Sequence, residues 1–216
     1  MAVLQKKYVR KMRIFWPSKN DSLKPAGNKQ STMSLRVVVG PMFAGKTSEI
    51  QSVVRRYGCL GKSVLVLTAD IDNRYQSNVV AIVNHDKVTV PARAVSVRGL
   101  GDVLAWSEFA AATAIVVDEA QFFVDCLIPF VRAAVDKHGK HVVVVGLDGD
   151  ADKRPFGDVL ALMTHADSIE KKTALCRHCG DGTPAIFTRA LVAHDAQVAV
   201  GGAEMYEPVC RRHYSA

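Results

Sequence analysis

The chain has 216 residues, 49% of them hydrophobic, which is enough apolar material for one globular domain, or for one domain with a small appendage. No apolar run approaches the roughly 18 residues that a membrane-spanning helix requires, so we expect a soluble protein with no membrane partner. The net charge of +7 would suggest nucleic-acid binding, but residues 1–33 carry eight basic residues and one acidic residue, and the remaining 20 basic and 20 acidic residues cancel. We therefore expect no nucleic-acid partner for the folded part.

The basic residues 1–33 lack sustained hydrophobic periodicity, and we interpret them as a flexible N-terminal extension. A segment rich in Arg and Lys and poor in acidic residues is also typical of an organellar transit peptide, and the composition leaves both interpretations open. The five cysteines form an odd set that does not resemble a secreted disulfide framework, which favours a reducing compartment. We expect a cytoplasmic protein.

Residues 40–47 read GPMFAGKT and fit the pattern G-x-x-x-x-G-K-[ST] of a phosphate-binding P-loop. An expected strand at residues 35–39 precedes them, and a segment with helical periodicity at residues 48–60 follows. Backbone N–H groups of such a loop, with the helix N-terminus, favour a bound polyphosphate. In this interpretation, as opposed to a chance match, Lys46 reaches the β- and γ-phosphates of ATP and the Thr47 hydroxyl binds Mg²⁺. The predicted ATP-binding residues of the loop are Gly40, Pro41, Met42, Phe43, Ala44, Gly45, Lys46 and Thr47.

The segments that follow alternate between expected strands and helices. Four strands of this part are continuous apolar runs, which indicates burial on both faces, as in a parallel sheet covered by helices. We predict an α/β fold of the P-loop (RecA-like) class for residues 34–167, with a mostly parallel sheet and helices on both faces. Further strands are expected over residues 63–68, 94–97, 115–117 and 142–147, a hairpin through residues 79–83 and 87–90, and helices over residues 101–111 and 127–138.

Two acidic residues, Asp118 and Glu119, follow the apolar strand at residues 115–117. P-loop enzymes need a carboxylate at the end of a neighbouring strand to hold Mg²⁺, and ligands bind at that edge of open α/β sheets. A second carboxylate beside the phosphates could accept a proton from an attacking hydroxyl or water. The alternative is that Asp118 and Glu119 are only the polar end of a strand and have no catalytic role. The letters DEAQ also resemble a helicase motif, but the chain is too short for two helicase core domains.

The C-terminal part contains two pairs of candidate metal ligands. Cys176 and Cys179 form one pair, and Cys210 and His213 form the other. Thiolates and imidazoles in such pairs suit tetrahedral Zn²⁺, and four protein ligands would make the metal structural. Alternatives are surface cysteines without a metal, and His178 in place of His213 as the fourth ligand. We predict a small zinc-ribbon domain over residues 168–216.

A series of short motifs runs in order through residues 35–214. They are GPMFAGKT at 40–47, DNRY at 72–75, DEAQFF at 118–123, LDG at 147–149 with RPFG at 154–157, TALC at 173–176, and GGA at 201–203 with YEPVC at 206–210. Together these motifs resemble those of the cytosolic (type II) thymidine kinases, and the set is far more specific than the P-loop alone. The resemblance implies that the second domain carries a "lasso" loop that grips a nucleoside base.

The resemblance implies transfer of the ATP γ-phosphate to the 5′-hydroxyl of thymidine, with deoxyuridine as a second substrate. Glu119 would be the general base, assisted by Lys46 and Arg74, and Asp118 and Gln121 would join the loop in binding ATP. Thr47, Asp72 and Asp118 would bind Mg²⁺. The family is typically a homotetramer with structural Zn²⁺ and feedback inhibition by thymidine triphosphate. The implied nucleoside-binding residues are Met42, Phe122, Leu147, Phe156, Thr188, Val200, Gly201, Gly202 and Tyr206.

The chain departs from the family's pattern at three positions: His213 where the last zinc ligand is usually Cys, Ala151 where an aromatic residue is expected, and Ala120 where Gly is common. Without the resemblance, two other function classes fit the P-loop and the paired carboxylates. One is an ATPase motor or switch in which Glu119 activates water, and the other is a structural protein that binds a nucleotide without turnover. Of the three, a thymidine kinase alone predicts a preference for pyrimidine nucleosides.

Overall fold

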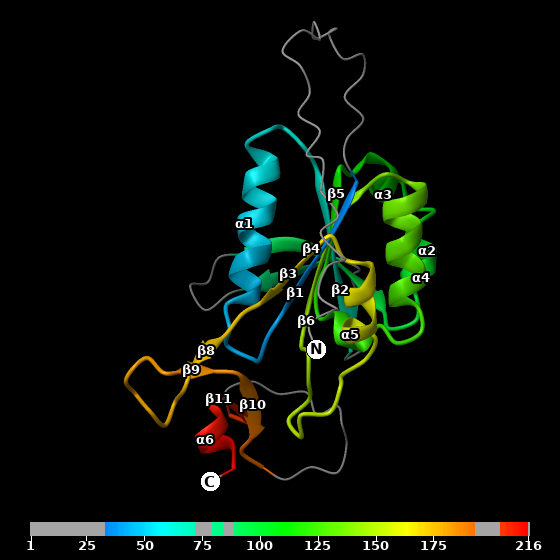
Figure 1. Cartoon of the computed structure of the whole chain (residues 1–216). Helices are drawn as coiled ribbons and strands as arrows, with labels where there is room; N and C mark the ends of the chain where they lie inside the picture. Colours follow the sequence, from blue (N-terminus) through cyan, green and yellow to red (C-terminus); the bar gives the residue numbers. More distant parts are fainter. Residues whose placement is uncertain (1–32, 72–78, 84–88, 193–203, 216) are drawn as a thin grey trace, which may run out of the picture. The chain divides into compact units, whose positions relative to one another are not determined.

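The computed structural model describes residues 33–71, 79–83, 89–192 and 204–215. Its largest element is a seven-stranded sheet with the order β3-β4-β2-β5-β6-β1-β7 (Figure 1). Neighbouring strands are parallel, except that β3 and β4 are antiparallel. The strands are β1 (Ser34–Val39), β2 (Val64–Asp70), β3 (Val79–Val83), β4 (Thr89–Ser96), β5 (Ala114–Val117), β6 (His141–Gly146) and β7 (Ser168–Lys171).

Helices cover both faces of the sheet, with α1 on one side and α2, α3 and α4 on the other (Figure 1). Within the described residues, no helix is both long and apolar enough to cross a membrane. The helical elements of this part are α1 (Lys46–Gly58), α2 (Leu100–Val103), α3 (Ser107–Ala111), η1 (Ala120–Phe122), α4 (Leu127–Arg132), η2 (Ala133–Lys137), α5 (Val159–Leu162) and η3 (Met163–His165).

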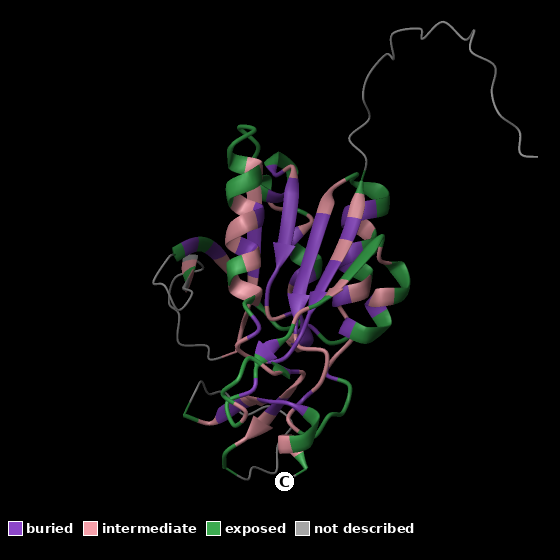
Figure 2. Ribbon diagram, turned by 60° about the vertical axis from the view of Figure 1, so that its left-hand side comes forward, coloured by how far each residue is buried: buried purple, intermediate pink, exposed green. Residues whose placement is uncertain are grey.

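Apolar strands bury side chains on both faces of the sheet, which Figure 2 shows as buried colour along their length. On β1, Val37 and Val39 belong to the core cluster shared with α2 to α5, whereas Val38 packs in the cluster shared with α1. All four residues of β5 are buried. This two-sided burial explains why the strands read as continuous apolar runs, and the predicted α/β class with a mostly parallel sheet is confirmed.

The expected hairpin and the expected strand at residues 94–97 form a single unit. Residues 89–90 and residues 94–96 belong to one strand, β4, which runs through Pro91. Pro91 is tolerated because β2 pairs with β4 only from Arg93 onward, so at Pro91 the strand has β3 as its neighbour on one side. The prediction of two separate strands was therefore wrong.

The helix predicted over residues 101–111 is also wrong in detail, because two short helices, α2 and α3, occupy this segment. The backbone becomes extended at Trp106, with φ −76° and ψ 142°. This break lets Leu104, Trp106 and Phe109 all pack against the same core cluster. The helix predicted over residues 127–138 is present as α4, and continues as the π-helical turn η2.

An ion-pair cluster connects the first turn of α1 to the edge of the sheet. Arg36 on β1 pairs with Glu49 at 2.8 Å and with Glu170 on β7, and Lys172 lies 2.7 Å from Glu170 and 3.3 Å from Glu49. Partial burial disfavours the Glu49 carboxylate, but hydrogen bonds with Arg36 and Lys172 outweigh it and lower the pKa of Glu49. Ionised Glu49 is thus stabilised by the fold.

The sheet continues through β7, which lies within residues 168–216, the range predicted for the second domain. β7 pairs on one side with β1. Its sequence, Ser-Ile-Glu-Lys, is mostly polar and exposed, so it lacks the apolar run by which the other parallel strands could be predicted. Beyond it, two small antiparallel pairs and a short helix follow. These are β8 (Ala174–Leu175) with β9 (Pro184–Ala185), β10 (Phe187–Ala190) with β11 (Tyr206–Val209), and α6 (Arg211–Tyr214).

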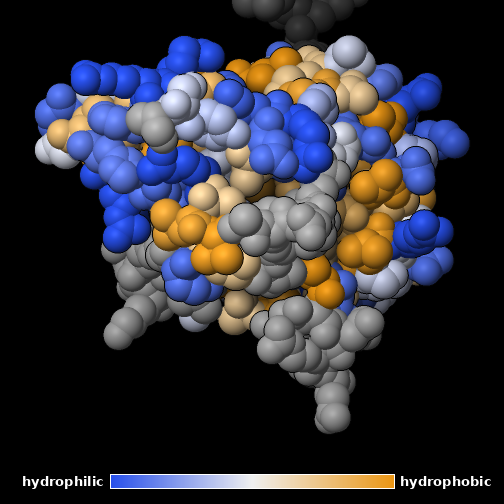
Figure 3. All heavy atoms as spheres, turned by 90° about the horizontal axis from the view of Figure 1, so that it is seen from below, coloured by the Kyte–Doolittle hydropathy of each residue, from blue (hydrophilic) through white to orange (hydrophobic). Residues whose placement is uncertain are grey.

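The C-terminal part has a core of its own, into which Ala44 of the loop between β1 and α1 packs together with Ala185 and Val209. The end of the molecule seen from below in Figure 3 exposes both hydrophobic and hydrophilic residues. Leu175 and Val192 are among the exposed hydrophobic residues of the C-terminal part. Single exposed apolar residues are normal on soluble domains, so they do not by themselves define a docking surface.

Candidate active site and metal centre

The loop at residues 40–47 joins the C-terminal end of β1 to the start of α1. Gly40 has φ +151°, and a Cβ built on it would lie 2.4 Å from the Lys172 carbonyl oxygen. Phe43 and Gly45 also have positive φ values, +65° and +74°. The loop therefore turns tightly against the sheet, and only glycine fits at its first position. The 13-residue helix α1 begins at Lys46 and directs its free N–H groups toward this loop.

Lys46 lies over the loop, and its ammonium group is hydrogen-bonded to the loop backbone. Its Nζ donates to the carbonyl oxygens of Pro41 at 2.7 Å and Gly40 at 3.1 Å. Burial lowers the pKa of Lys46, while the negative charges of Glu119, Asp118 and Asp148 act in the opposite direction. The ammonium group is thus close to acidic groups that follow β5 and β6.

Asp118 and Glu119 follow β5 at the edge of the sheet, as the sequence predicts. The Asp118 carboxyl is buried, with 7% of the residue exposed. Burial, and after it the charge of Glu119, raises the pKa of Asp118 to about 8. Glu119 adopts the left-handed conformation, with φ 50° and ψ 41°, which is uncommon for a residue with a side chain. A buried carboxyl next to a strained acidic residue and a lysine is typical of a functional site.

Other predicted site residues fall into two contacting pairs. The Met42 backbone N–H donates to the Thr188 hydroxyl at 3.0 Å, which connects the loop to β10. The rings of Phe122 and Phe156 meet edge to face, with centroids 5.5 Å apart.

Thr188 and Phe156 are buried, and so is Tyr206 at the start of β11. Leu147 follows β6 and is half-buried. The predicted residues Asp72, Arg74, Val200, Gly201 and Gly202 lie outside the described residues.

Gln121, which the resemblance implies as an ATP-binding residue, lies inside the protein. It is 1% exposed, and its side-chain amide bonds both the Glu119 carboxylate and the Leu147 backbone.

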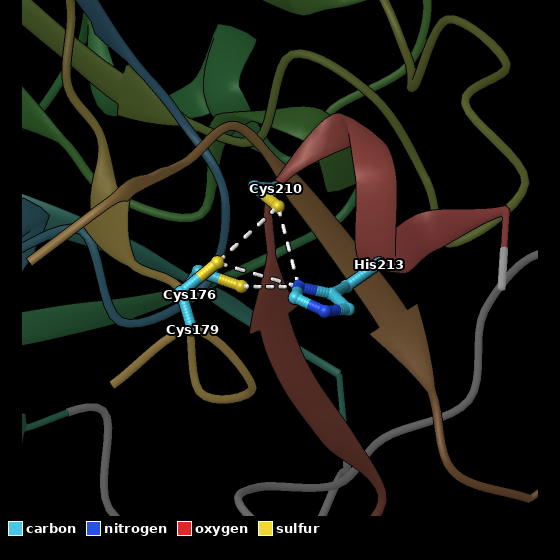
Figure 4. A group of neighbouring side chains, drawn as sticks. All are labelled: Cys176, Cys179, Cys210 and His213. Carbon is cyan, nitrogen blue, oxygen red and sulfur yellow. Dashed lines mark hydrogen bonds between the residues drawn. The ribbon is translucent and has the colours of Figure 1, made fainter. Parts of the chain in front are cut away.

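Four residues of the C-terminal part meet as a candidate metal centre (Figure 4). The ligand atoms of Cys176, Cys179, Cys210 and His213 all lie within 4.8 Å of one another. The Sγ atoms of Cys179 and Cys210 are 3.8 Å apart, and His213 Nδ1 lies 3.4 to 3.5 Å from the three sulfurs. A tetrahedral zinc site with Zn–S of about 2.3 Å and Zn–N of about 2.0 Å requires separations of about 3.8 Å and about 3.5 Å. The four residues therefore fit zinc, with His213 as the fourth ligand.

The thiols of this centre are free, as are the chain's other cysteines. Burial disfavours the Cys176 thiolate, but hydrogen bonds from the backbone of Cys210, Cys179 and His178 outweigh it and lower the pKa of Cys176 to about 5. A thiolate is the form that binds a metal.

Charged residues next to the metal centre hold the ligand-bearing segments together. Glu207, 3% exposed on β11, accepts from Arg189 Nε at 2.9 Å and lies 3.0 Å from His178 Nε2. Arg189 also donates to the carbonyl oxygen of His213 at 2.5 Å. Neither Arg189 nor Glu207 was expected from the sequence. Their partners are distant in sequence, so no local spacing could have indicated them.

The C-terminal helix is tied to the loop that follows β6. The Tyr214 hydroxyl donates to the Ala151 carbonyl oxygen at 2.6 Å, and Lys153 Nζ lies 3.9 Å from the centre of the Tyr214 ring. The contact at Ala151 uses the backbone, so it does not require the aromatic side chain that the family's pattern has there.

Comparisons with known proteins agree with this geometry. Residues 33–214 match the profile of a family described as "Thymidine kinase". A thymidine kinase of Oryza sativa subsp. japonica is 40% identical over 182 residues, which is 83% of this chain and 65% of that protein. The cytosolic thymidine kinase of Homo sapiens is 34% identical over 190 residues, 88% of this chain and 76% of that protein. A thymidine kinase of Pseudothermotoga lettingae is 35% identical over 181 residues, 84% of this chain and 94% of that protein. The match to the rice protein thus covers less than two thirds of that protein's length, and the family match covers most of the present chain. This chain belongs to the thymidine kinase family.

Proposed function

We propose that the protein is an ATP:thymidine 5′-phosphotransferase that forms thymidine monophosphate for DNA synthesis, with deoxyuridine as a second substrate. The observation that carries the proposal is the juxtaposition of Lys46, Asp118 and Glu119 beside the glycine-containing loop at the carboxyl edge of the sheet. Family membership supplies the substrate class.

Backbone N–H groups of residues 40–47 and the start of α1 would cradle the ATP phosphates. Thr47 and Asp118, with Asp72, would hold Mg²⁺, and the donor set of a hydroxyl and carboxylates is one that Mg²⁺ accepts. Burial raises the pKa of the Asp118 carboxyl, and a bound cation would favour its ionised form. When bound, the ion would neutralise charge on the transferring phosphate.

Glu119 would accept the proton of the nucleoside 5′-hydroxyl as that oxygen attacks the γ-phosphorus, while the bond from the γ-phosphorus to the β–γ bridging oxygen breaks and ADP leaves. Lys46, released from the carbonyls of Gly40 and Pro41, would move its charge to the phosphates, and Arg74 would add a second positive charge. These groups would align the reactants and balance charge, and these two effects account for most of the catalysis of phosphoryl transfer.

The thymine base would bind between the rings of Phe122 and Phe156 on one side and the β10–β11 hairpin next to the candidate metal centre on the other. The hydrogen bond from Met42 to Thr188 fixes one side of this space against the phosphate loop. Discrimination by a single methyl group is worth about 1–3 kcal/mol, which is why deoxyuridine should also react. The proposed nucleoside-binding residues are Met42, Phe122, Leu147, Phe156, Thr188, Val200, Gly201, Gly202 and Tyr206.

We extend the proposal to the wider properties that family membership suggests. Zn²⁺ at Cys176, Cys179, Cys210 and His213 would be structural, because four protein ligands leave no open position. The active species would be a cytoplasmic homotetramer inhibited by thymidine triphosphate, and residues 1–33 and 168–216 would act as an extension and as the zinc-binding and lasso domain.

The test is transfer of labelled phosphate from ATP to thymidine, deoxyuridine and deoxycytidine, measured in parallel for wild type, Glu119→Gln and Glu108→Gln. Glu108, exposed on α3 and paired with Arg93, is the matched control. We expect thymidine to react fastest, Glu119→Gln to lose at least about 100-fold in kcat while still binding ATP, and Glu108→Gln to resemble wild type. ATP hydrolysis at a rate that does not depend on added nucleoside would instead identify an ATPase. Equal turnover by wild type and Glu119→Gln would remove Glu119 from its role.

A further inference from the structure

Gln121 is a buried polar side chain that connects the proposed general base to the backbone of Leu147, the residue that follows β6. Its Nε2 donates to Glu119 Oε2 at 2.6 Å, and its Oε1 accepts from the Leu147 backbone N–H at 3.0 Å. With 1% of the residue exposed, both ends of the amide are used inside the protein.

The orientation of this amide follows from its two partners. A carboxylate can only accept, and a backbone N–H can only donate. A reversed amide would place Oε1 against the Glu119 carboxylate and Nε2 against the Leu147 N–H, and both contacts would be repulsive. The N–H donor of Gln121 therefore faces Glu119.

Two glycines let the neighbouring backbone approach Gln121 closely. A Cβ on Gly146 would lie 2.8 Å from Gln121 Oε1, and a Cβ on Gly157 would lie 2.2 Å from the Gln121 carbonyl oxygen. Gly157 also has a positive φ of +59°. The end of β6 thus lies against the Gln121 side chain, and the turn at Gly157 lies against the Gln121 backbone, which leaves the residue little freedom.

Glu119 needs such a support because its backbone is strained. A left-handed conformation costs a residue with a Cβ free energy, and it persists only where the surrounding structure holds it. The hydrogen bond from Gln121 fixes the carboxylate end of this residue, while η1 fixes its backbone through the Phe122 N–H, which donates to the Glu119 carbonyl.

We propose that Gln121 is a positioning residue that holds the Glu119 carboxylate in place for proton transfer and couples it to the backbone of Leu147 on the nucleoside side. The inference rests on the proposed role of Glu119. In this inference Gln121 orients the general base, whereas the sequence predicted that Gln121 binds ATP.

The substitution Gln121→Met keeps the length of the side chain and removes both hydrogen bonds. Since a misplacement of about 1 Å can cost about 100-fold in rate, we expect kcat to fall about 10- to 100-fold. The KM for ATP should change less than about threefold, because the phosphate-binding loop is untouched. Val131→Ala, which truncates a fully buried residue of α4, is the control for lost stability.

A double-mutant cycle separates positioning from a merely structural role. The measurement is kcat and KM for wild type, Gln121→Met, Glu119→Gln and the double variant, on the full chain loaded with zinc. If Gln121 acts through Glu119, Gln121→Met should cost less than about threefold in the Glu119→Gln background. Val131→Ala should leave kcat within about twofold of wild type.

The outcomes are distinguishable. A wild type without thymidine phosphorylation would refute the proposed function itself, and a fully active Glu119→Gln variant would remove Glu119 from its proposed role as general base. If those two behave as proposed, an equal loss from Gln121→Met in both backgrounds would overturn the inference alone, as would a large rise in the KM for ATP with kcat unchanged. A Gln121→Met variant that keeps wild-type kcat would also overturn it.

Discussion

Replacing Gly40 by alanine tests whether the fold depends on a tight turn between β1 and the rest of the loop at residues 40–47. The new Cβ would lie 2.4 Å from the Lys172 carbonyl oxygen, a separation that real Cβ atoms essentially never show. The neighbouring atom belongs to the backbone, so it cannot turn away as a flexible side chain could. The Lys172 N–H also donates to the Val39 carbonyl at 2.8 Å, and this bond holds the chain after β7 against β1.

The expected cost has two parts. Forcing a Cβ into φ +151° costs about 1–3 kcal/mol, and the displaced Lys172 backbone loses a hydrogen bond worth about 1 kcal/mol. We therefore expect Gly40→Ala to lower the free energy of unfolding by about 3 kcal/mol. For a chain of this size that corresponds to a fall in Tm of about 6–12 °C.

The assay is urea unfolding followed by circular dichroism and tryptophan fluorescence, with zinc held in excess because metal binding would otherwise shift the transition. Gly58→Ala is the matched control, since Gly58 lies at the end of α1 with no atom within 4 Å of the added Cβ. Alanine is favoured there, and we expect Gly58→Ala to be as stable as wild type or up to about 1 kcal/mol more stable. A Gly40→Ala protein within about 1 kcal/mol of wild type would refute the reasoning.

Three further predictions follow from the site and from the ion pairs. Cys210→Ala should leave an incomplete metal centre, so the protein as purified should contain less than about a tenth of the wild-type zinc by elemental analysis, and full occupancy would contradict the site. Thr188→Val removes the acceptor of the Met42 N–H and should raise the KM for thymidine at least about fivefold in steady-state kinetics, with an unchanged KM as the contrary result. Because the pKa of Glu49 is lowered in the folded state, its contribution is present above the unfolded pKa of about 4.3 and is lost as the pH falls through the folded value. The stability gap between wild type and Glu49→Gln, measured by urea unfolding, should therefore shrink from pH 6 to pH 3, and a constant gap would refute this.

Features of the site that depend on local sequence could be predicted. The loop at residues 40–47 and the acids after β5 could be placed because a continuous apolar strand fixes where its polar end emerges, and the parallel sheet brings such ends to one edge. The spacing also indicated the candidate metal ligands, and the structure groups His213, and not His178, with the three cysteines. His178 instead pairs with Glu207.

Features that depend on contacts between distant segments could not be predicted. The pairing of Arg189 with Glu207 joins two strands of a hairpin whose register no local pattern specifies. The division of residues 101–111 into two helices arises from packing of Leu104 and Trp106, which overrides helical periodicity. The environment of Gln121 depends on Leu147, which the chain reaches only one strand later.

The tie between Tyr214 and Ala151 makes the last turn of the chain important for the whole C-terminal part. Removal of terminal residues usually costs a domain little, since chain ends are loosely held. Here, a chain cut before His213 would lose a candidate metal ligand and the tyrosine that is hydrogen-bonded to the loop after β6. Such a cut would therefore disrupt the C-terminal part while leaving every residue of the loop at residues 40–47 in place.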